Sequence, residues 1–312
     1  ANNALRELEL KEKKEIERIL AELSSEAAAY RDAIDLDYRM LVQLDVIFAK
    51  AKLAYRMRAW APIMNDQGRV ELRNARHPLI DPKTVVPISL RLGTDFDTMI
   101  ITGPNTGGKT VTLKTVGLLT LMAECGLHVP AGDGSVLSTF DAILADIGDE
   151  QSIDNDLSTY SSHLLNMKNM LAGASSSTLV LIDEFGSGTE PVIGGAIAEA
   201  ILERLLAKGC YGVITTHYAN IKYYASNTEG IANGAMMFDV QHIRPLFRLE
   251  TGKPGSSFAV EIARKIGLPE DIIRAAGEKA GSDHINIEKQ LREIARDKHY
   301  WEQKRDRIRQ TD

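Results

Sequence analysis

The sequence has few of the features that mark secreted, membrane or disulfide-rich proteins. It contains two cysteines, Cys125 and Cys210, among 312 residues, which is too few for a disulfide framework and is typical of a reducing cytosol. No run approaches the ~18 consecutive apolar residues of a membrane span. The polar N-terminus has neither the apolar core nor the cleavage site of a secretion signal. We therefore expect a cytoplasmic protein with no membrane partner.

The sequence also has no surplus of positive charge. The formal net charge is −6, so the chain as a whole does not have the basic surface of a non-specific nucleic-acid binder. Residues 1–60 hold 11 basic and 11 acidic side chains, and residues 282–312 hold 8 basic and 7 acidic ones. Both ends are therefore dense in mixed charge, as solvated helices are, and the acidity belongs to the central body.

Glycine and proline are absent before Pro62, and this absence predicts a helical arm over residues 1–61. Apolar residues recur at helical spacing, at Ile16, Ile19, Leu20 and Leu23 and again at Leu41, Leu44, Ile47 and Phe48. A single helix of about 60 residues would be roughly 90 Å long. Because the apolar pattern thins near Ser24–Ser25, two helices fit the sequence equally well.

The arm offers only a weak case for direct nucleic-acid contact. Four basic residues could face phosphates: Lys11, Lys13, Lys14 and Arg18. Three acidic residues lie among them: Glu12, Glu15 and Glu17. A binding surface normally needs clustered lysine and arginine to release counterions. A solvated helix face is the better interpretation, and a plain coiled arm and a ligand-contacting arm both remain open.

Between residues 62 and 255, short β-rich runs alternate with helical stretches, and this alternation predicts an α/β domain with a mostly parallel sheet. The expected strands cover residues 97–102, 141–145, 178–182 and 211–215, and residues 235–249 predict an edge hairpin. Residues 256–281 predict two short helices joined at Gly267-Leu268-Pro269. Residues 282–312 predict the start of a charged helical linker.

The strongest motif is a glycine-rich loop that matches G-x-x-x-x-G-K-[ST] at every fixed position. Its residues are Gly103, Pro104, Asn105, Thr106, Gly107, Gly108, Lys109 and Thr110. A predicted strand precedes the loop and a predicted helix follows it, so a chance match is a poor alternative. Backbone N–H groups of such a loop surround phosphate oxygens at a helix N-terminus. Lys109 is expected to reach the β- and γ-phosphates of a nucleotide, and the Thr110 hydroxyl is expected to bind Mg²⁺.

An acidic pair follows the apolar strand expected at residues 178–182. Asp183 at the strand end is expected to meet Mg²⁺, and Glu184, which faces the other way, is expected to polarise the attacking water. Taken alone, Asp-Glu after a strand would be no more than a turn. Because the pair lies 74 residues after Lys109, it becomes the expected second half of a nucleotide-hydrolysing site.

His217 follows the next predicted strand, residues 211–215. A single histidine after a strand is often structural. This one lies at the edge of the sheet where nucleotides bind in such folds. We therefore expect it to contact the γ-phosphate.

These motifs, with their order and spacing, resemble the ATPase of the MutS mismatch-repair superfamily. The matching segments are residues 103–110, Ser158-Thr159-Tyr160, residues 183–189 and Thr215-Thr216-His217-Tyr218. The resemblance runs from about residue 41 to residue 280. It implies an ABC-type P-loop NTPase whose cofactors are ATP and Mg²⁺, with two nucleotides enclosed in a homodimer. The dimer would form through the ATPase face and the C-terminal helices.

The resemblance also assigns residues to the dimer interface and to a branch. Ser158 would be the signature serine, offered to the γ-phosphate across the dimer, and residues 186–189 would line the same interface. Thr106 and the run of residues 160–164 look more like the anti-recombination and ribosome-rescue branch than the repair enzyme. Gly132 stands where repair enzymes carry Gln. The coupling between nucleotide state and the arms would therefore differ from that of the repair enzymes. Gln151 is a candidate to take the place of the missing Gln.

The function that this resemblance implies is a nucleotide-gated motor. Its partners would be branched or double-stranded DNA, collided ribosomes, or both, and the alternative is the mismatch-recognition ATPase of the repair branch. In the anti-recombination and ribosome-rescue branch, the full-length protein would carry further lever and clamp sequence and a C-terminal nuclease domain. We expect this chain to be a piece that does not cut DNA itself.

Two other functional classes fit the sequence less well. A chromosome-structural ATPase would need a coiled coil between its nucleotide motifs, and the 74-residue spacing leaves no room for one. A switch that binds nucleotide without hydrolysing it would not need Glu184.

Overall fold

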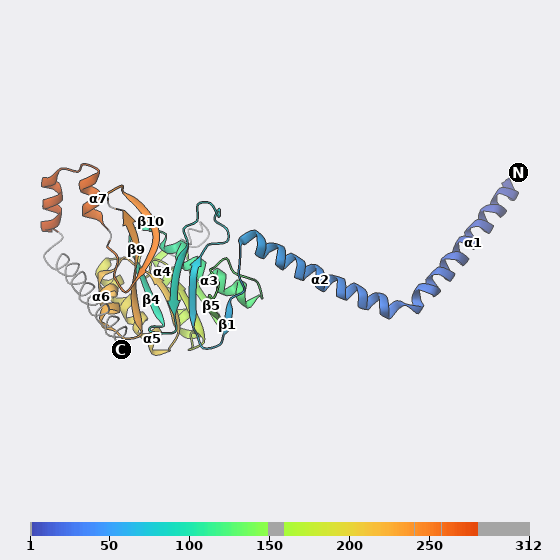
Figure 1. The fold of residues 1–312 in the computed structure, drawn as a ribbon, viewed down its shortest axis with the longest axis horizontal. Coiled ribbons are helices and arrows are strands. Elements are labelled where there is room, and N and C mark those ends of the chain that lie inside the picture. The colour runs from blue at the N-terminus through green and yellow to red at the C-terminus, as the bar shows by residue number, and fades with distance from the viewer. Residues whose placement is uncertain (1, 149–158, 240, 257, 280–312) are drawn as a thin grey trace, which may run out of the picture. The chain divides into compact units, whose positions relative to one another are not determined.

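The computed structural model describes residues 2–148, 159–239, 241–256 and 258–279. The chain divides into two compact units, residues 1–56 and 57–312 (Figure 1). Gln151, Ser158 and the predicted linker over residues 282–312 lie outside the described residues. Within the described ranges, no helix has both the length and the apolar composition that a membrane span requires.

The first unit consists of two helices, α1 (Asn2–Ala29) and α2 (Arg31–Met57), with α2 ending just inside the second unit. The break lies at Tyr30, whose N–H donates to the Ala27 carbonyl over 3.1 Å, three residues back instead of four. The thinning apolar pattern near Ser24–Ser25 therefore placed the break about five residues too early. Residues 3–50 are all exposed.

Local ion pairs support these exposed helices. The pairs are Glu7–Lys11, Glu15–Arg18, Arg18–Glu22 and Asp35–Arg39. Such pairs contribute little to stability, because both partners are exposed and solvent screens their attraction. Helix propensity and the absence of glycine and proline therefore carry most of the stability of α1 and α2.

The second unit is built around a six-stranded sheet in the order β10-β9-β4-β8-β7-β6. Its strands are β4 (Thr98–Thr102), β6 (Ala142–Asp146), β7 (Thr178–Ile182), β8 (Tyr211–Thr215), β9 (Ile231–Asp239) and β10 (Arg244–Thr251). All neighbouring pairs are parallel except β9 with β10. The four predicted strands and the predicted edge hairpin are confirmed. Since β4, β7 and β8 are adjacent and parallel, their carboxyl ends meet at one edge.

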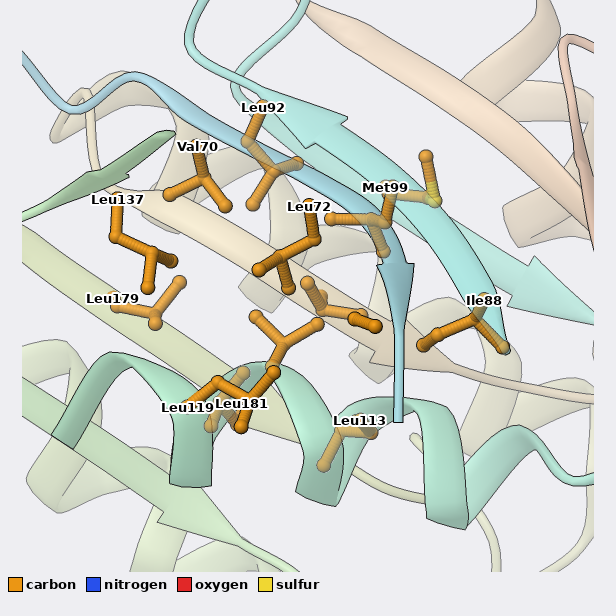
Figure 2. Packing of buried hydrophobic residues seen from close by; sticks show 14 of the residues in the cluster. Val70, Leu72, Ile88, Leu92, Met99, Leu113, Leu119, Leu137, Leu179 and Leu181 are labelled. Atoms are coloured by element: carbon orange, nitrogen blue, oxygen red, sulfur yellow. The ribbon is translucent and has the colours of Figure 1, made fainter. Parts of the chain in front are cut away.

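Side chains of the sheet alternate between two apolar layers. Met99 and Ile101 pack with α3 (Lys109–Glu124) and a second sheet, whereas Ile100 packs with α4 (Thr159–Gly173), α5 (Pro191–Ala207) and α6 (Ala219–Asn227). Figure 2 shows side chains of α3 directed toward the strands, among them Leu113 and Leu119. Both faces of the sheet are therefore covered, which explains why the strands are continuously apolar.

The second sheet was not predicted. It contains four strands in the order β1-β5-β2-β3: β1 (Ile63–Asn65), β5 (Val136–Ser138), β2 (Val70–Ala75) and β3 (Ile88–Leu92). Two of these strands have three residues, and β5 begins more than 40 residues after the last of the other three strands ends. Such short, distant segments leave little periodicity for sequence analysis to detect.

The predicted pair of C-terminal helices is confirmed. Helix α7 (Ala259–Lys265) and a second helix over residues 270–279 are joined through Gly267, whose φ of +87° lies in the left-handed region. The ring of Phe258, just before α7, stacks on Phe238 of β9 with ring centroids 5.7 Å apart. This contact holds the start of the helical pair against the hairpin.

Candidate functional site

The glycine-rich loop runs from the end of β4, through the short 3₁₀ helix η1 (Asn105–Gly107), to the start of α3. Gly108 has φ of +90°, and a Cβ added there would lie 3.0 Å from Phe247 Cδ1. A Cβ added at Gly103 or Gly107 would lie 3.0 or 3.2 Å from Met236 Cβ. The β9–β10 hairpin therefore packs against the loop so closely that side chains at these glycines would have to displace it.

Lys109 is the first residue of α3, and its side chain is held inside this loop. The residue is 2% exposed, and its Nζ donates to the Gly103 carbonyl over 2.9 Å and to Asn105 Oδ1 over 3.1 Å. Nζ also lies 3.2 Å from His217 Nε2. Because an ammonium group only donates, His217 Nε2 is the acceptor and the imidazole proton is on Nδ1. The structure thus brings together Lys109 and His217, which are 108 residues apart in sequence.

The electrostatics of this site favour an anion. Burial lowers the pKa of Lys109, and the nearby charge of Lys222 lowers it further, while Glu184 and Asp183 oppose both effects. The pKa of His217 is also lowered, first by desolvation of its ring and then by the charges of Lys109 and Lys222. His217 is exposed as a residue, so solvent moderates this shift. A bound phosphate would offset the cost of burying the cationic groups.

The acidic pair lies at the end of β7, as predicted, and its two side chains differ in environment. Asp183 is 7% exposed, and its Oδ1 accepts a hydrogen bond of 2.5 Å from Thr215 Oγ1. Glu184 is exposed and has φ of +48°, a left-handed conformation that is rare for a residue with a side chain. The backbone turn therefore points the two carboxylates into different surroundings.

The donor groups fit Mg²⁺ that arrives with a nucleotide. Thr110 is half-buried in the first turn of α3, and Asp183 is buried at the end of β7. Among the described residues, no group of three or more His, Cys, Asp or Glu side chains could hold a metal on its own. Mg²⁺ commonly takes one or two protein oxygens and completes its shell with phosphate oxygens and water. A hydroxyl and a carboxylate are a suitable set for that arrangement.

A second buried carboxylate lies near Asp183 and was not predicted from the sequence. Asp146 ends β6, is 5% exposed, and its Oδ2 lies 2.6 Å from His163 Nδ1, while its Oδ1 accepts from Asn166 over 2.8 Å. Its backbone carbonyl accepts from the Asp183 N–H over 2.9 Å. Asp146 therefore connects α4 to the strand end that carries Asp183. Asp146 follows a predicted strand in the sequence, as Asp183 does, and this position could have indicated a residue at the same edge of the sheet.

We expect Asp146→Asn to destabilise the chain by about 1–3 kcal/mol, because the new amide would present a donor to partners that also donate. Chemical denaturation measures this change. The matched control is Asp141→Asn. Asp141 directly precedes β6, and its exposed carboxylate accepts a hydrogen bond from the Ser177 hydroxyl. The control should change stability by less than about 0.5 kcal/mol. Equal effects of the two substitutions would contradict a structural role for the Asp146 bonds.

The loop expected to line a dimer interface lies beside the start of α4. Gly188 has φ of +93°, and a Cβ added there would lie 3.3 Å from Tyr160 Cβ. Tyr218 Oη donates to the Gly186 carbonyl over 2.8 Å and fixes the other side of the loop. Ser158 itself lies outside the described residues, but Tyr160, two positions later, lines the same cavity as Gly186 and Ser187 of this loop.

Gly132 has a packing reason to lack a side chain. Its N–H donates to the Arg73 carbonyl over 2.5 Å, and an added Cβ would lie 3.0 Å from the same oxygen. Gly132 lies in the turn before β5, against β2, and a larger residue would push the turn away from that strand. Gln151, the suggested substitute, lies outside the described residues.

Comparison with known proteins identifies relatives over almost the whole chain. The family profile of MutS domain V matches residues 99–282. The chain is 53% identical over 287 residues to Endonuclease MutS2 of Lachnospira eligens, covering 92% of this chain and 36% of that protein. It is 50% identical over 293 residues to Endonuclease MutS2 of Caldanaerobacter subterraneus, covering 94% and 37%. It is 46% identical over 297 residues to the putative endonuclease MutS2 of Bacillus subtilis, covering 95% and 38%. The chain thus spans little more than a third of the length of these relatives.

Proposed function

Because this chain belongs to the MutS family, we propose that it is an ATP-binding and ATP-hydrolysing motor domain of the ABC-type P-loop class. The observation that carries the proposal is the convergence of Lys109, Asp183, Glu184 and His217 at the adjoining carboxyl ends of β4, β7 and β8. These residues come from three segments of the chain. Ligands of open parallel sheets bind at this edge.

In this proposal the glycine-rich loop and Lys109 bind the triphosphate. Lys109 Nζ now uses neutral acceptors, the Gly103 carbonyl and the Asn105 amide. Phosphate oxygens are charged acceptors and form stronger bonds. The N–H groups at the start of α3 add the positive end of the helix dipole. Affinity for the triphosphate therefore depends largely on one buried cation and the loop backbone.

Hydrolysis in this proposal depends on Glu184. Its carboxylate is exposed next to the buried Asp183, so it is available to accept a proton from the attacking water. Mg²⁺, bound by Thr110 and Asp183, would neutralise charge on the phosphate oxygens when present. His217, in contact with Lys109, would meet the γ-phosphate. Separate groups thus serve binding and proton transfer.

An aromatic side chain that was not predicted from the sequence is available to contact the adenine of the nucleotide. Phe247 of β10 is 41% exposed, has φ of +53°, and lies against Gly108 at the edge of the loop. An exposed ring next to a phosphate-binding loop offers a flat apolar surface on which adenine stacks. Phe247 is therefore our candidate for contact with the base.

We further propose that two chains enclose the nucleotides in a homodimer, with Ser158 of each chain facing the nucleotide of the other. The closeness of Gly188 to Tyr160, where an added Cβ would lie 3.3 Å from Tyr160 Cβ, supports a shared surface, since the two predicted interface segments lie next to each other. The C-terminal helices and the turn that joins them expose apolar side chains that a dimer would cover. These are Val260, Ile266, Leu268 and Ile272, which are 41–68% exposed.

Mixing two inactive variants tests the shared site. A Lys109→Ala chain keeps Ser158, and a Ser158→Arg chain keeps its own loop. In a mixed dimer one site would combine the intact loop of the second chain with the intact serine of the first. We expect ATPase activity to return on mixing, at up to about half of the wild-type value per dimer. No recovery, although both variants fold and exchange subunits, would contradict the shared site.

For the whole protein we propose the anti-recombination and ribosome-rescue branch, because the relatives that match most of this chain are named Endonuclease MutS2. The nuclease activity in that name belongs to those longer proteins. The partners would be branched or double-stranded DNA, collided ribosomes, or both. Titrating full-length protein with each partner, with and without ATP, distinguishes them, and preferential binding of mismatched DNA would instead favour the repair branch.

A further inference from the structure

Thr215 is a buried residue at the nucleotide edge of the sheet with no role in the proposed chemistry so far. It is the last residue of β8 and is 0% exposed. Its Oγ1 donates to Asp183 Oδ1 over 2.5 Å and accepts from the Glu184 N–H over 2.8 Å. A single hydroxyl therefore bonds to both residues of the acidic pair.

The backbone of Thr215 extends this connection to the next residue. Its carbonyl accepts from the Phe185 N–H over 2.8 Å. Three consecutive residues after β7 are thus bonded to Thr215. Asp183 and Glu184 bond to its hydroxyl, and Phe185 bonds to its main-chain carbonyl. The neighbouring threonine differs, because Thr216 Oγ1 donates to the Phe185 carbonyl and accepts from the Tyr218 N–H. Of these two hydroxyls, the one on Thr215 bonds to Asp183 and Glu184.

The left-handed backbone of Glu184 explains why such a bond is needed. A residue with a side chain seldom adopts φ near +48°, and it keeps this conformation only where surrounding bonds hold it. Without an acceptor for its N–H, the peptide before Glu184 loses one of the bonds that oppose its rotation toward an ordinary turn, although the Glu184 carbonyl still accepts from the Ser187 N–H over 2.9 Å. That rotation would move the exposed carboxylate relative to Asp183.

Strand formation alone does not account for a hydroxyl at this position. The two preceding residues of β8, Val213 and Ile214, are buried and apolar. Valine has the shape of threonine and suits a buried parallel strand equally well. A hydroxyl buried here is favourable because it has partners, and those partners belong to the acidic pair.

We propose that Thr215 is a positioning residue for ATP hydrolysis, whose hydroxyl orients the Asp183 carboxylate and holds the backbone that presents Glu184. This inference rests on the proposed function, since it assigns Asp183 to Mg²⁺ and Glu184 to the attacking water. In this proposal Thr215 itself contacts neither the Mg²⁺ bound by Asp183 nor the water activated by Glu184. Its effect should therefore appear in turnover and in Mg²⁺ dependence, and not in affinity for the nucleotide.

The test compares Thr215→Val, which removes the hydroxyl, with Thr215→Ser, which keeps it. We expect Thr215→Val to lower kcat at least about tenfold, as the loss of one bond to a charged group predicts. It should also raise the Mg²⁺ concentration needed for half-maximal turnover. The Kd for ATP measured without Mg²⁺ should change less than about twofold. Thr215→Ser should retain most of the wild-type kcat.

Thr120→Val is the matched control, since Thr120 is also 0% exposed and its hydroxyl bonds to the Val116 carbonyl within α3. It should keep the wild-type kcat. Thr215→Ala provides a second hydroxyl-free variant if Thr215→Val does not fold. A kcat for folded Thr215→Val within about twofold of the control, or an equal loss in Thr215→Ser, would overturn the proposal. If the unmodified chain binds ATP but does not hydrolyse it, the proposed function fails as well, and the unmodified chain alone reveals that failure.

Discussion

Replacing Lys109 by methionine is expected to weaken ATP binding by roughly tenfold to a hundredfold, which corresponds to the ~1.5–3 kcal/mol of a hydrogen bond to a charged group. Methionine keeps the length and the apolar stem of lysine but has no charge. The Lys109 ammonium is buried among the groups of the loop, and burial lowers its pKa. A triphosphate would restore a full set of strong partners to this cation. The measurement is an equilibrium titration with ATP in the presence of Mg²⁺.

Lys114→Met is the matched control for this prediction, because Lys114 is an exposed lysine of the same helix. The control should bind ATP with wild-type affinity, and chemical denaturation should show that both variants are folded. Undiminished affinity of a folded Lys109→Met chain would exclude Lys109 as the phosphate ligand and would remove the main support for the nucleotide site.

Replacing Glu184 by glutamine should produce a chain that binds MgATP and hydrolyses it about 10²- to 10⁴-fold more slowly, which is the usual contribution of a general base. Glutamine preserves the shape of the side chain and does not accept a proton. The bond between the Glu184 N–H and Thr215 is a backbone bond and remains in the variant. The two measurements are steady-state phosphate release and an ATP titration.

Glu203→Gln, on the exposed side of α5, makes the same chemical change away from the site and should leave turnover unaffected. Turnover by Glu184→Gln at the rate of this control would remove Glu184 from the role of base. A loss of ATP affinity as large as the loss of turnover would point instead to a binding role.

The parts of the fold that were predictable are those with strong local patterns. The apolar runs of β4, β7 and β8 are continuous because both faces of the sheet are covered, and the glycine-rich loop follows β4 directly. Each of these signals lies within a few consecutive residues. The edge hairpin and the paired C-terminal helices were likewise marked by local alternation and by Gly267.

The parts that were not predictable depend on contacts between distant segments. Thr215 and Asp146 look like ordinary strand residues in sequence, and their roles arise only where β6, β7 and β8 lie side by side. The four-stranded sheet joins β5 to strands that end more than 40 residues earlier. The arm break at Tyr30 depends on one backbone bond that has no signature in apolar spacing.

The sequence predicted which residues form the site more fully than it predicted the contacts between them. Lys109, Asp183, Glu184 and His217 were all chosen from motif and strand position, and the fold brings them to one edge. The contact between Lys109 and His217 was not foreseen, nor was the approach of Phe247 to Gly108. Both depend on how the end of β8 and the middle of β10 lie against the loop.

Phosphate release from ATP by the purified chain, measured with Mg²⁺ and with a chelator and in parallel for Lys109→Met, tests the central claim most directly. That claim is that the edge formed by β4, β7 and β8 is an Mg²⁺-dependent ATPase site. We predict saturable release with Mg²⁺, little release with the chelator, and strongly reduced release by Lys109→Met at subsaturating ATP. Absence of release by the unmodified chain, or equal release by the folded Lys109→Met chain, would contradict it.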